Sequence, residues 1–263
     1  MDQEALEAAA LSVVHRKLIG GSHILHHHHV LDAYGHLSVR HPTKPDVFIL
    51  SRDAAPATIT SPRDLVEYWV KDAAPVDPDH APKGFAERHI HSELVVHSHA
   101  DAVLPYTING VPLRPCYHMA GFLGHWSPVW DIASARAGAG GSSSGDMLVR
   151  TEALGAALAQ QFKYSTTVVL MRGHGFTAVA GAGGIEEVVF RAVYTAQNAA
   201  VQTTALTTQA AYHSRNDAPL QPIKFLSPEE AEASKNMASD TVMRPWGLWL
   251  REVEASNLYL NSA

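Results

Sequence analysis

Residues 95–99 read Val-Val-His-Ser-His, an apolar run that predicts a buried strand ending in two histidines. Side chains two positions apart lie on the same face of a strand, so His97 and His99 can bind one metal ion through neutral imidazole nitrogens. A candidate third ligand, His174, follows a second apolar strand and stands between two glycines that leave its imidazole unobstructed. The alternatives are a pair of surface histidines and a turn histidine without function.

Glu87 precedes the histidine pair by ten residues, at the start of a short helix that the pattern predicts over 87–94. A carboxylate near three histidines could be a fourth metal ligand or a general acid or base. An exposed helical glutamate is the alternative, and the residues alone do not choose between them.

The rest of the chain alternates between strand and helix patterns. We expect a helix over 4–19 that ends at Gly20-Gly21-Ser22, with Leu6 and Val13 on its apolar face. The other expected features are a hairpin over 34–40 and 47–51, loop and edge structure over 53–84, β-prone runs at 94–100 and 102–108, a Gly/Ser-rich loop at 137–145, a helix over 151–164, strands at 166–171 and 176–180, a long helix over 185–211 and a last helix from Ser227. The pattern predicts one α/β domain over 1–263, with a central sheet between helices.

Composition excludes several classes of protein. The 263 residues are 46% hydrophobic and 17% charged, which is typical of a globular chain, and the net charge of −6 argues against a nucleic-acid partner. No apolar run is long enough to span a membrane. A single cysteine, Cys116, and an acidic N-terminus favour a reducing, cytoplasmic compartment. The 17 histidines are an excess, and they direct attention to metal chemistry with a small-molecule substrate.

Several motifs occur in an order that resembles the class II aldolase/adducin family. They are Gly-His-Leu-Ser-Val-Arg at 35–40, Ile-Leu-Ser at 49–51, Glu87 with His91, the histidine pair at 95–99 and Arg-Gly-His-Gly at 172–175. The resemblance implies a three-layer α/β/α sandwich around a mostly antiparallel sheet. It also implies a homotetramer with active sites between subunits, and a divalent metal, with zinc or manganese favoured and iron possible. By the same resemblance His97, His99 and His174 are the metal ligands and Glu87 is the catalytic carboxylate.

Two further segments, 112–124 and 147–151, resemble the branch of that family that includes 3-hydroxy-2-methylpyridine-4,5-dicarboxylate decarboxylase. The chain also departs from the sugar-phosphate aldolases of the family. Phe85 and Ala86 stand where those enzymes have small hydroxyl residues, and His36 stands where they have asparagine. These departures argue against a phosphorylated sugar substrate. The connection from Glu87 to His97 is also shorter than is usual in the family.

Five other residues are candidates for the site. His36, Arg40 and Arg114 are expected to bind substrate, with Arg114 as a clamp for a carboxylate because its forked guanidinium matches two oxygens. Tyr117 and His118 are expected to take a catalytic part from a neighbouring subunit. The alternatives are a turn cap for His36, a surface salt bridge for Arg114 and plain packing for Tyr117 and His118. The run His26–His29 is expected on a helix surface or an interface.

The leading hypothesis is a metal-dependent carbon–carbon lyase, most simply a decarboxylase of a hydroxy-aromatic or enolisable acid. The first alternative keeps the metal and catalyses a non-redox cyclisation or isomerisation of a phenolic, polyketide-like metabolite. Retro-aldol cleavage, an iron-dependent oxygenase and a non-catalytic, adducin-like binding module are the remaining alternatives.

Overall fold

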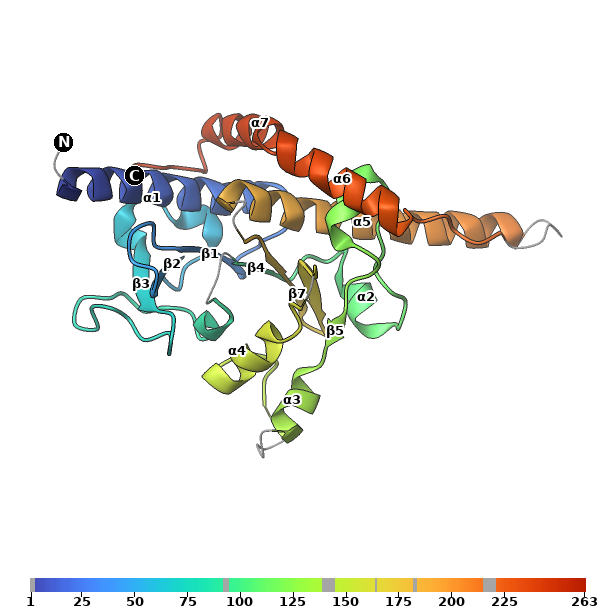
Figure 1. Cartoon of the computed structure of the whole chain (residues 1–263), viewed down its shortest axis with the longest axis horizontal. Coiled ribbons are helices and arrows are strands. Elements are labelled where there is room, and N and C mark those ends of the chain that lie inside the picture. Colours follow the sequence, from blue (N-terminus) through green and yellow to red (C-terminus); the bar gives the residue numbers. More distant parts are fainter. Residues whose placement is uncertain (1–2, 92–94, 139–144, 164, 182–183, 215–220) are drawn as a thin grey trace.

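A seven-stranded sheet forms the centre of the computed structural model (Figure 1), which describes residues 3–91, 95–138, 145–163, 165–181, 184–214 and 221–263. The strand order is β3-β2-β1-β4-β7-β6-β5, and the only parallel pair in the described sheet is β5 with β6. The strands are β1 (His36–Arg40), β2 (Val47–Ser51), β3 (Leu65–Trp69), β4 (Val95–Ser98), β5 (Val129–Trp130), β6 (Val168–Met171) and β7 (Gly175–Val179). The expectation of a mostly antiparallel sheet is confirmed.

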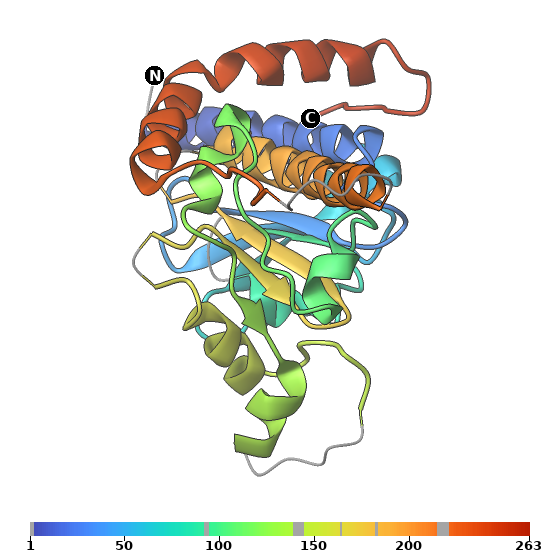
Figure 2. The same cartoon turned by 90° about the vertical axis from the view of Figure 1, so that its right-hand side faces the viewer.

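Helices cover both faces of this sheet (Figure 2). They are α1 (Gln3–His27), α2 (Leu104–Ile108), α3 (Ile132–Gly138), α4 (Glu152–Ala159), α5 (Gly184–His213), α6 (Pro228–Thr241) and α7 (Met243–Glu254). The long helices α1 and α5 lie on one face with α6 and α7 outside them, and the short helices α3 and α4 lie on the other face. The expected α/β/α arrangement is therefore confirmed. In the described part of the chain, no helix has the length and apolarity that crossing a membrane requires.

Strand register separates an apolar face of the sheet from the face that carries the polar site. His36 pairs with His97, and His97 pairs with Thr177. Since residues two apart share a face, these side chains project to the face opposite α1 and α5. Leu37 and Val96 project to the α1 and α5 side and join the main apolar core. The face with the histidines is covered by smaller elements and leaves room for a cavity.

Helix α1 differs from the expectation for the N-terminal segment. It runs through Gly20-Gly21-Ser22 to His27, and its buried part is Leu18–Leu25, while Leu6 and Val13 are about half exposed. The expected break is wrong because these small residues permit close packing: a Cβ at Gly21 would stand 2.8 Å from the Leu37 side chain. The Ser22 hydroxyl donates to the Leu18 carbonyl within the helix.

Three other expectations need correction. Within the run 102–108, residues 104–108 form helix α2 rather than a strand, because Pro105 presets a helical φ in its first turn. Within 87–91 there is only a 3₁₀ turn, Arg88–Ile90, and the remainder of that expected helix, 92–94, lies outside the described residues. Ser227 caps α6 as expected, but α7 follows it and is the last helix. Residues 139–144 of the expected Gly/Ser-rich loop and Tyr164 also lie outside the described residues.

Candidate metal centre

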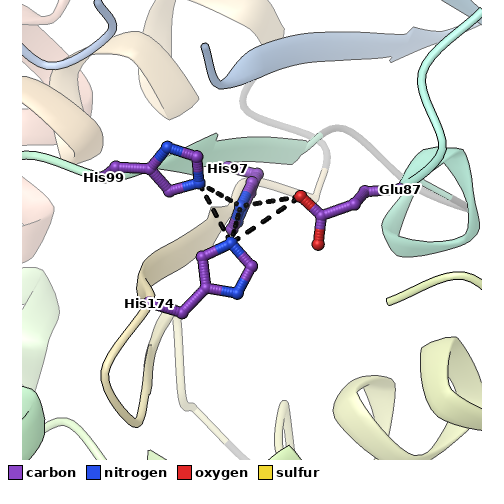
Figure 3. A group of neighbouring side chains, drawn as sticks. All are labelled: Glu87, His97, His99 and His174. Carbon is purple, nitrogen blue, oxygen red and sulfur yellow. Dashed lines mark hydrogen bonds and ion pairs between the residues drawn. The ribbon is translucent and has the colours of Figure 1, made fainter. Parts of the chain in front are cut away.

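Four side chains converge at the end of β4 on the polar face of the sheet (Figure 3). The Nε2 atoms of His97, His99 and His174 are 3.0–3.2 Å from one another. Glu87 Oε2 lies 3.6 Å from Nε2 of His97 and 3.7 Å from Nε2 of His174. The four candidate ligand atoms lie within 4.8 Å of one another. The sequence hypothesis had named these same four residues.

The three imidazole nitrogens are spaced as ligands of one cation would be, and Glu87 Oε2 lies slightly farther out. Bonds of about 2.0–2.1 Å to nitrogen at tetrahedral angles separate two ligand atoms by about 3.4 Å. Three imidazoles and one carboxylate suit zinc, manganese or iron in chemical type. The four residues therefore fit a divalent transition metal.

His174 is held with its Nε2 free for a metal. Its Nδ1 lies 2.9 Å from the Met147 carbonyl oxygen, which can only accept, so Nδ1 carries the proton. The turn that presents His174 joins β6 to β7. That turn requires glycine at 175, because a Cβ there would lie 2.0 Å from the Ser98 carbonyl oxygen. Glycine thus allows β7 to approach the end of β4, where His97 and His99 stand.

His97 is oriented by a buried neighbour in the sheet. Its Nδ1 lies 3.4 Å from Thr177 Oγ1, and that hydroxyl donates in turn to the Met171 sulfur at 3.3 Å. With its own proton directed to Met171, Thr177 accepts from His97 Nδ1–H, which leaves His97 Nε2 unprotonated.

Burial keeps the three imidazoles in their neutral form. Burial, together with neighbouring histidines, lowers the pKa of His174 to about 4 and that of His97 well below its ordinary value. Burial also lowers the pKa of His99. The neutral imidazole is the form that binds a metal, so the protein does not have to remove protons from these ligands near pH 7.

One carboxylate oxygen of Glu87 faces the cluster, and the other is held by a hydrogen bond. Its Oε1 accepts a hydrogen bond from the Val149 amide at 2.9 Å. The residue is 6% exposed, and burial raises its pKa to about 7 against the opposing effect of that hydrogen bond. The exposed glutamate that served as the alternative is therefore excluded.

A cavity of about 920 Å³ lies beside the cluster and is lined in part by Glu87 and His99. Its other walls come from 33–36, 53–55, 68, 75, 78, 81–86, 88, 148 and 150. A second cavity of about 520 Å³ also contacts His99 and is lined by His26, His28 and His29. The histidine run therefore borders this second cavity, with His26 bonded to the Tyr259 hydroxyl at 2.9 Å. His27, the last residue of α1, and His29 are exposed, as expected for a surface run, whereas His26 and His28 are half-buried.

His36 lies in the wall of the larger cavity and is part of a buried chain of hydrogen bonds. Its Nδ1 is 2.5 Å from His91 Nε2, and His91 Nδ1 is 2.7 Å from Ser38 Oγ. Burial lowers the pKa of His91 to about 3, so both rings are neutral. His91 was noted in the sequence only as a motif residue, because nothing local to residue 91 indicates its contact with β1.

The other expected site residues lie elsewhere in the described chain. Arg40 is at the far end of β1 from His36 and donates to the Pro45 carbonyl. Arg114 lies over the Phe225 ring at 4.4 Å. Tyr117 donates to Gln197 at 3.5 Å, and His118 is exposed. These four residues do not line the cavity beside the cluster.

Arg150 is a cavity residue that sequence reasoning did not single out. It lines the larger cavity and donates to Asp146 through Nε and Nη2. The sequence feature that could have indicated it is its place in the motif 147–151. Arg150 directly follows Val149, whose amide donates a hydrogen bond to Glu87. Arg150 thus lies at this cavity, whereas Arg114 does not line it.

Comparison with known proteins agrees with this geometry. The model of the Class II Aldolase and Adducin N-terminal domain matches residues 17–203. The decarboxylase tropJ of Talaromyces stipitatus is 50% identical over 268 residues, which cover 96% of this chain and 98% of that protein.

Solved structures share the fold at lower identity. An aldolase II superfamily protein from Pseudomonas syringae has a TM-score of 0.66 at 17% identity, with 95% of each chain covered. The L-fuculose 1-phosphate aldolase of Glaciozyma antarctica has a TM-score of 0.66 at 16% identity, over 94% of this chain and 91% of that one.

The family model and the 50%-identical relative together make the chain an enzyme of the lyase type. The matched segment 17–203 contains the four clustered residues and every strand of the sheet. The chain therefore belongs to the class II aldolase and adducin family.

Proposed function

We propose that the protein is a metal-dependent decarboxylase of a hydroxy-aromatic or enolisable carboxylic acid. The observation that carries the proposal is the convergence of Glu87, His97, His99 and His174 at the edge of a large cavity. The name of the 50%-identical relative, a decarboxylase, supports the same reaction. Zinc or manganese is the proposed ion, with iron as an alternative.

His97, His99 and His174 would hold the ion, and the substrate would take the place that Glu87 Oε2 faces, so that Glu87 acts as the acid and not as a fourth ligand. When bound, the cation acts as a Lewis acid that stabilises negative charge on a substrate oxygen. The chain itself positions the substrate in the cavity and keeps the three imidazoles neutral through burial and fixed hydrogen bonds at Nδ1 of His97 and His174.

Glu87 is the proposed proton donor. Its Oε1 is fixed by the Val149 amide, so Oε2 faces the cluster and the cavity. When carbon dioxide leaves, the electron pair of the broken bond remains on the ring or enol carbon, and a proton from Glu87 Oε2 completes the product.

His36 and Arg150 are proposed to contact the substrate from the cavity wall. We further propose a homo-oligomer, by family resemblance a tetramer, in which Tyr117 and His118 act on the site of a neighbouring subunit. A role for Arg40 or Arg114 would require the same arrangement.

The test is metal content together with carbon dioxide release. Protein purified without chelator should contain about one ion per chain and should release carbon dioxide from one member of a panel of ortho-hydroxy aromatic acids. His97→Ala should lose the ion and at least about 100-fold in turnover, because even indirect ligand supports contribute 10–100-fold. His125→Ala, at an exposed histidine, is the matched control. Isomer formation without carbon dioxide would instead favour a cyclase or isomerase, and a metal-free, unaffected His97→Ala variant would refute metal dependence.

A further inference from the structure

We infer that Tyr68 recognises an uncharged oxygen atom of the substrate at the end of the larger cavity remote from the metal centre. The inference rests on the proposed function for the identity of the cavity as the substrate site. It adds a specificity residue that lies in a segment without any of the motifs described above.

Strand register directs Tyr68 to the same face as the cluster. Tyr68 pairs with Phe48, which pairs with Arg40, and Arg40 shares its face with His36 and hence with His97. Strand β3 is three positions from β4 in the sheet, or about 14 Å at the usual spacing of strands. The Tyr68 side chain lines the larger cavity, as do His36 and Glu87. The cavity therefore extends from the cluster to Tyr68.

The Tyr68 hydroxyl is buried without a hydrogen-bond partner among the described residues. The residue is 1% exposed, and its ring is stacked on Phe48, with 5.3 Å between centroids. Buried hydroxyl groups nearly always have a partner, so an unpaired one at a cavity wall points to a ligand. Burial raises the pKa of Tyr68 to about 12, so the hydroxyl keeps its proton and can donate it.

Gly84 leaves space for this hydroxyl. A Cβ at residue 84 would stand 1.8 Å from the Tyr68 hydroxyl oxygen and 3.0 Å from Cζ. Any other residue at 84 would thus displace the hydroxyl. The backbone of Gly84 is itself held by a bridge to Arg52.

The surroundings of the hydroxyl indicate the chemistry of the ligand. The cavity has apolar walls at Ala54, Ala55, Pro78 and three residues that lie with Tyr68: Pro75, which is bridged to it, and Ala81 and Phe85, which pack in its cluster. The charged groups nearby are already engaged: Lys83 pairs with Asp53 at 2.6 Å, and Arg88 donates to the carbonyls of Ala73 and Phe85. A flat, apolar ring system that carries a carbonyl or hydroxyl oxygen at its far end fits this arrangement.

Binding of two naphthoates tests the inference. Both 3-hydroxy-2-naphthoate and 3,7-dihydroxy-2-naphthoate carry the metal-chelating pair of oxygens, but only the second has a remote hydroxyl. Titration calorimetry on the zinc-loaded wild-type protein should show the dihydroxy compound bound about 5–10-fold tighter, the contribution of one hydrogen bond. In Tyr68→Phe the ratio of the two affinities should fall to about 1, while the affinity for the monohydroxy compound stays unchanged.

The thermal unfolding temperature of the ligand-free protein supplies a second measurement. Tyr68→Phe removes an unpaired buried hydroxyl, so the unfolding temperature should stay the same or rise. The matched control is Tyr106→Phe, because Tyr106 is equally buried and its hydroxyl bonds to the Ala199 carbonyl and Thr203. That control should lower the unfolding temperature and leave the preference between naphthoates intact.

The outcomes distinguish the role of Tyr68 from the proposed decarboxylase activity. A preference that is the same in wild type and Tyr68→Phe would overturn the inference, and so would failure of both naphthoates to bind. A preference that disappears in Tyr68→Phe while wild type releases no carbon dioxide from any aromatic acid would support the inference. That same result would overturn the decarboxylase proposal alone.

Discussion

Thr177 would position His97 for metal binding without contacting the ion itself. Its hydroxyl oxygen accepts a hydrogen bond from His97 Nδ1–H, and the residue is 1% exposed. Thr177→Val keeps the shape but removes the acceptor, so we expect the zinc dissociation constant to rise about 10–100-fold with little change in fold. Competition with a chromophoric chelator measures this constant. Thr177→Ser, which retains the hydroxyl, should bind as wild type does, and equal affinities for all three proteins would contradict the role.

Asp64 determines how stability responds to acid. Burial opposes its ionisation, but hydrogen bonds from the Thr60 amide, the Arg52 guanidinium and the Ser61 amide lower its pKa to about 2, below the ordinary 3.8. A depressed carboxyl pKa stabilises the folded state above the unfolded pKa, and this stabilisation is lost as the pH falls from about 4 to about 2. It amounts to at most about 2 kcal/mol, reduced by the partial exposure of Arg52.

Urea unfolding as a function of pH checks this prediction. Asp64→Asn should be less stable than wild type by up to about 2 kcal/mol at pH 7, with the difference closing near pH 2. Asp240→Asn, at an exposed position of α6, is the control and should match wild type throughout. A difference for Asp64→Asn that is constant with pH would show that its charge is not the cause.

At the scale of elements, the turn between β6 and β7 couples the sheet to the site. In Gly175→Ala the new Cβ would meet the Ser98 carbonyl at 2.0 Å, so β7 and the end of β4 must separate. We expect loss of metal binding and a marked fall in unfolding temperature. Gly173→Ala is the matched control: residue 173 has φ of 62° but no atom near the added Cβ.

The control isolates backbone strain from the clash. Gly173→Ala should cost about 1–2 kcal/mol, the strain of a left-handed alanine, and should still bind metal. Metal analysis and thermal unfolding of the two variants compare them directly. Retention of metal by Gly175→Ala would show that the approach of β4 and β7 does not position the ligands.

At the scale of the whole molecule, the ion would join segments that are far apart in the chain. Glu87 precedes β4, and His174 lies 77 positions after His97 in the sequence. Zinc at 100 times its dissociation constant should stabilise the folded protein by about 2.7 kcal/mol, or about 5–10 °C in unfolding temperature for a chain of this size. Thermal unfolding after EDTA, and after zinc is restored, measures the effect. His174→Ala should abolish the response, and an unfolding temperature indifferent to EDTA in wild type would refute it.

Local pattern alone predicts the elements that are regular over many residues. The long helix α5, the capped start of α6 and the apolar strand β6 follow from periodicity and capping that neighbouring residues provide. The same patterns failed where tertiary contacts decide the outcome. Helix α1 continues through two glycines because β1 and α5 pack against it, which no local periodicity records.

The sequence by itself indicated which histidines cluster, because His97 and His99 stand two positions apart at the end of one apolar run and His174 stands between two glycines. It also indicated Glu87 and the family through the order of the motifs. Only the tertiary structure decided which polar groups surround the substrate cavity. Arg150 and Tyr68 line it, while Arg40 and Arg114 lie elsewhere in the chain. The physical reason is that the spacing of side chains along a strand is local, whereas the walls of a cavity arise from strand pairing and packing between distant segments.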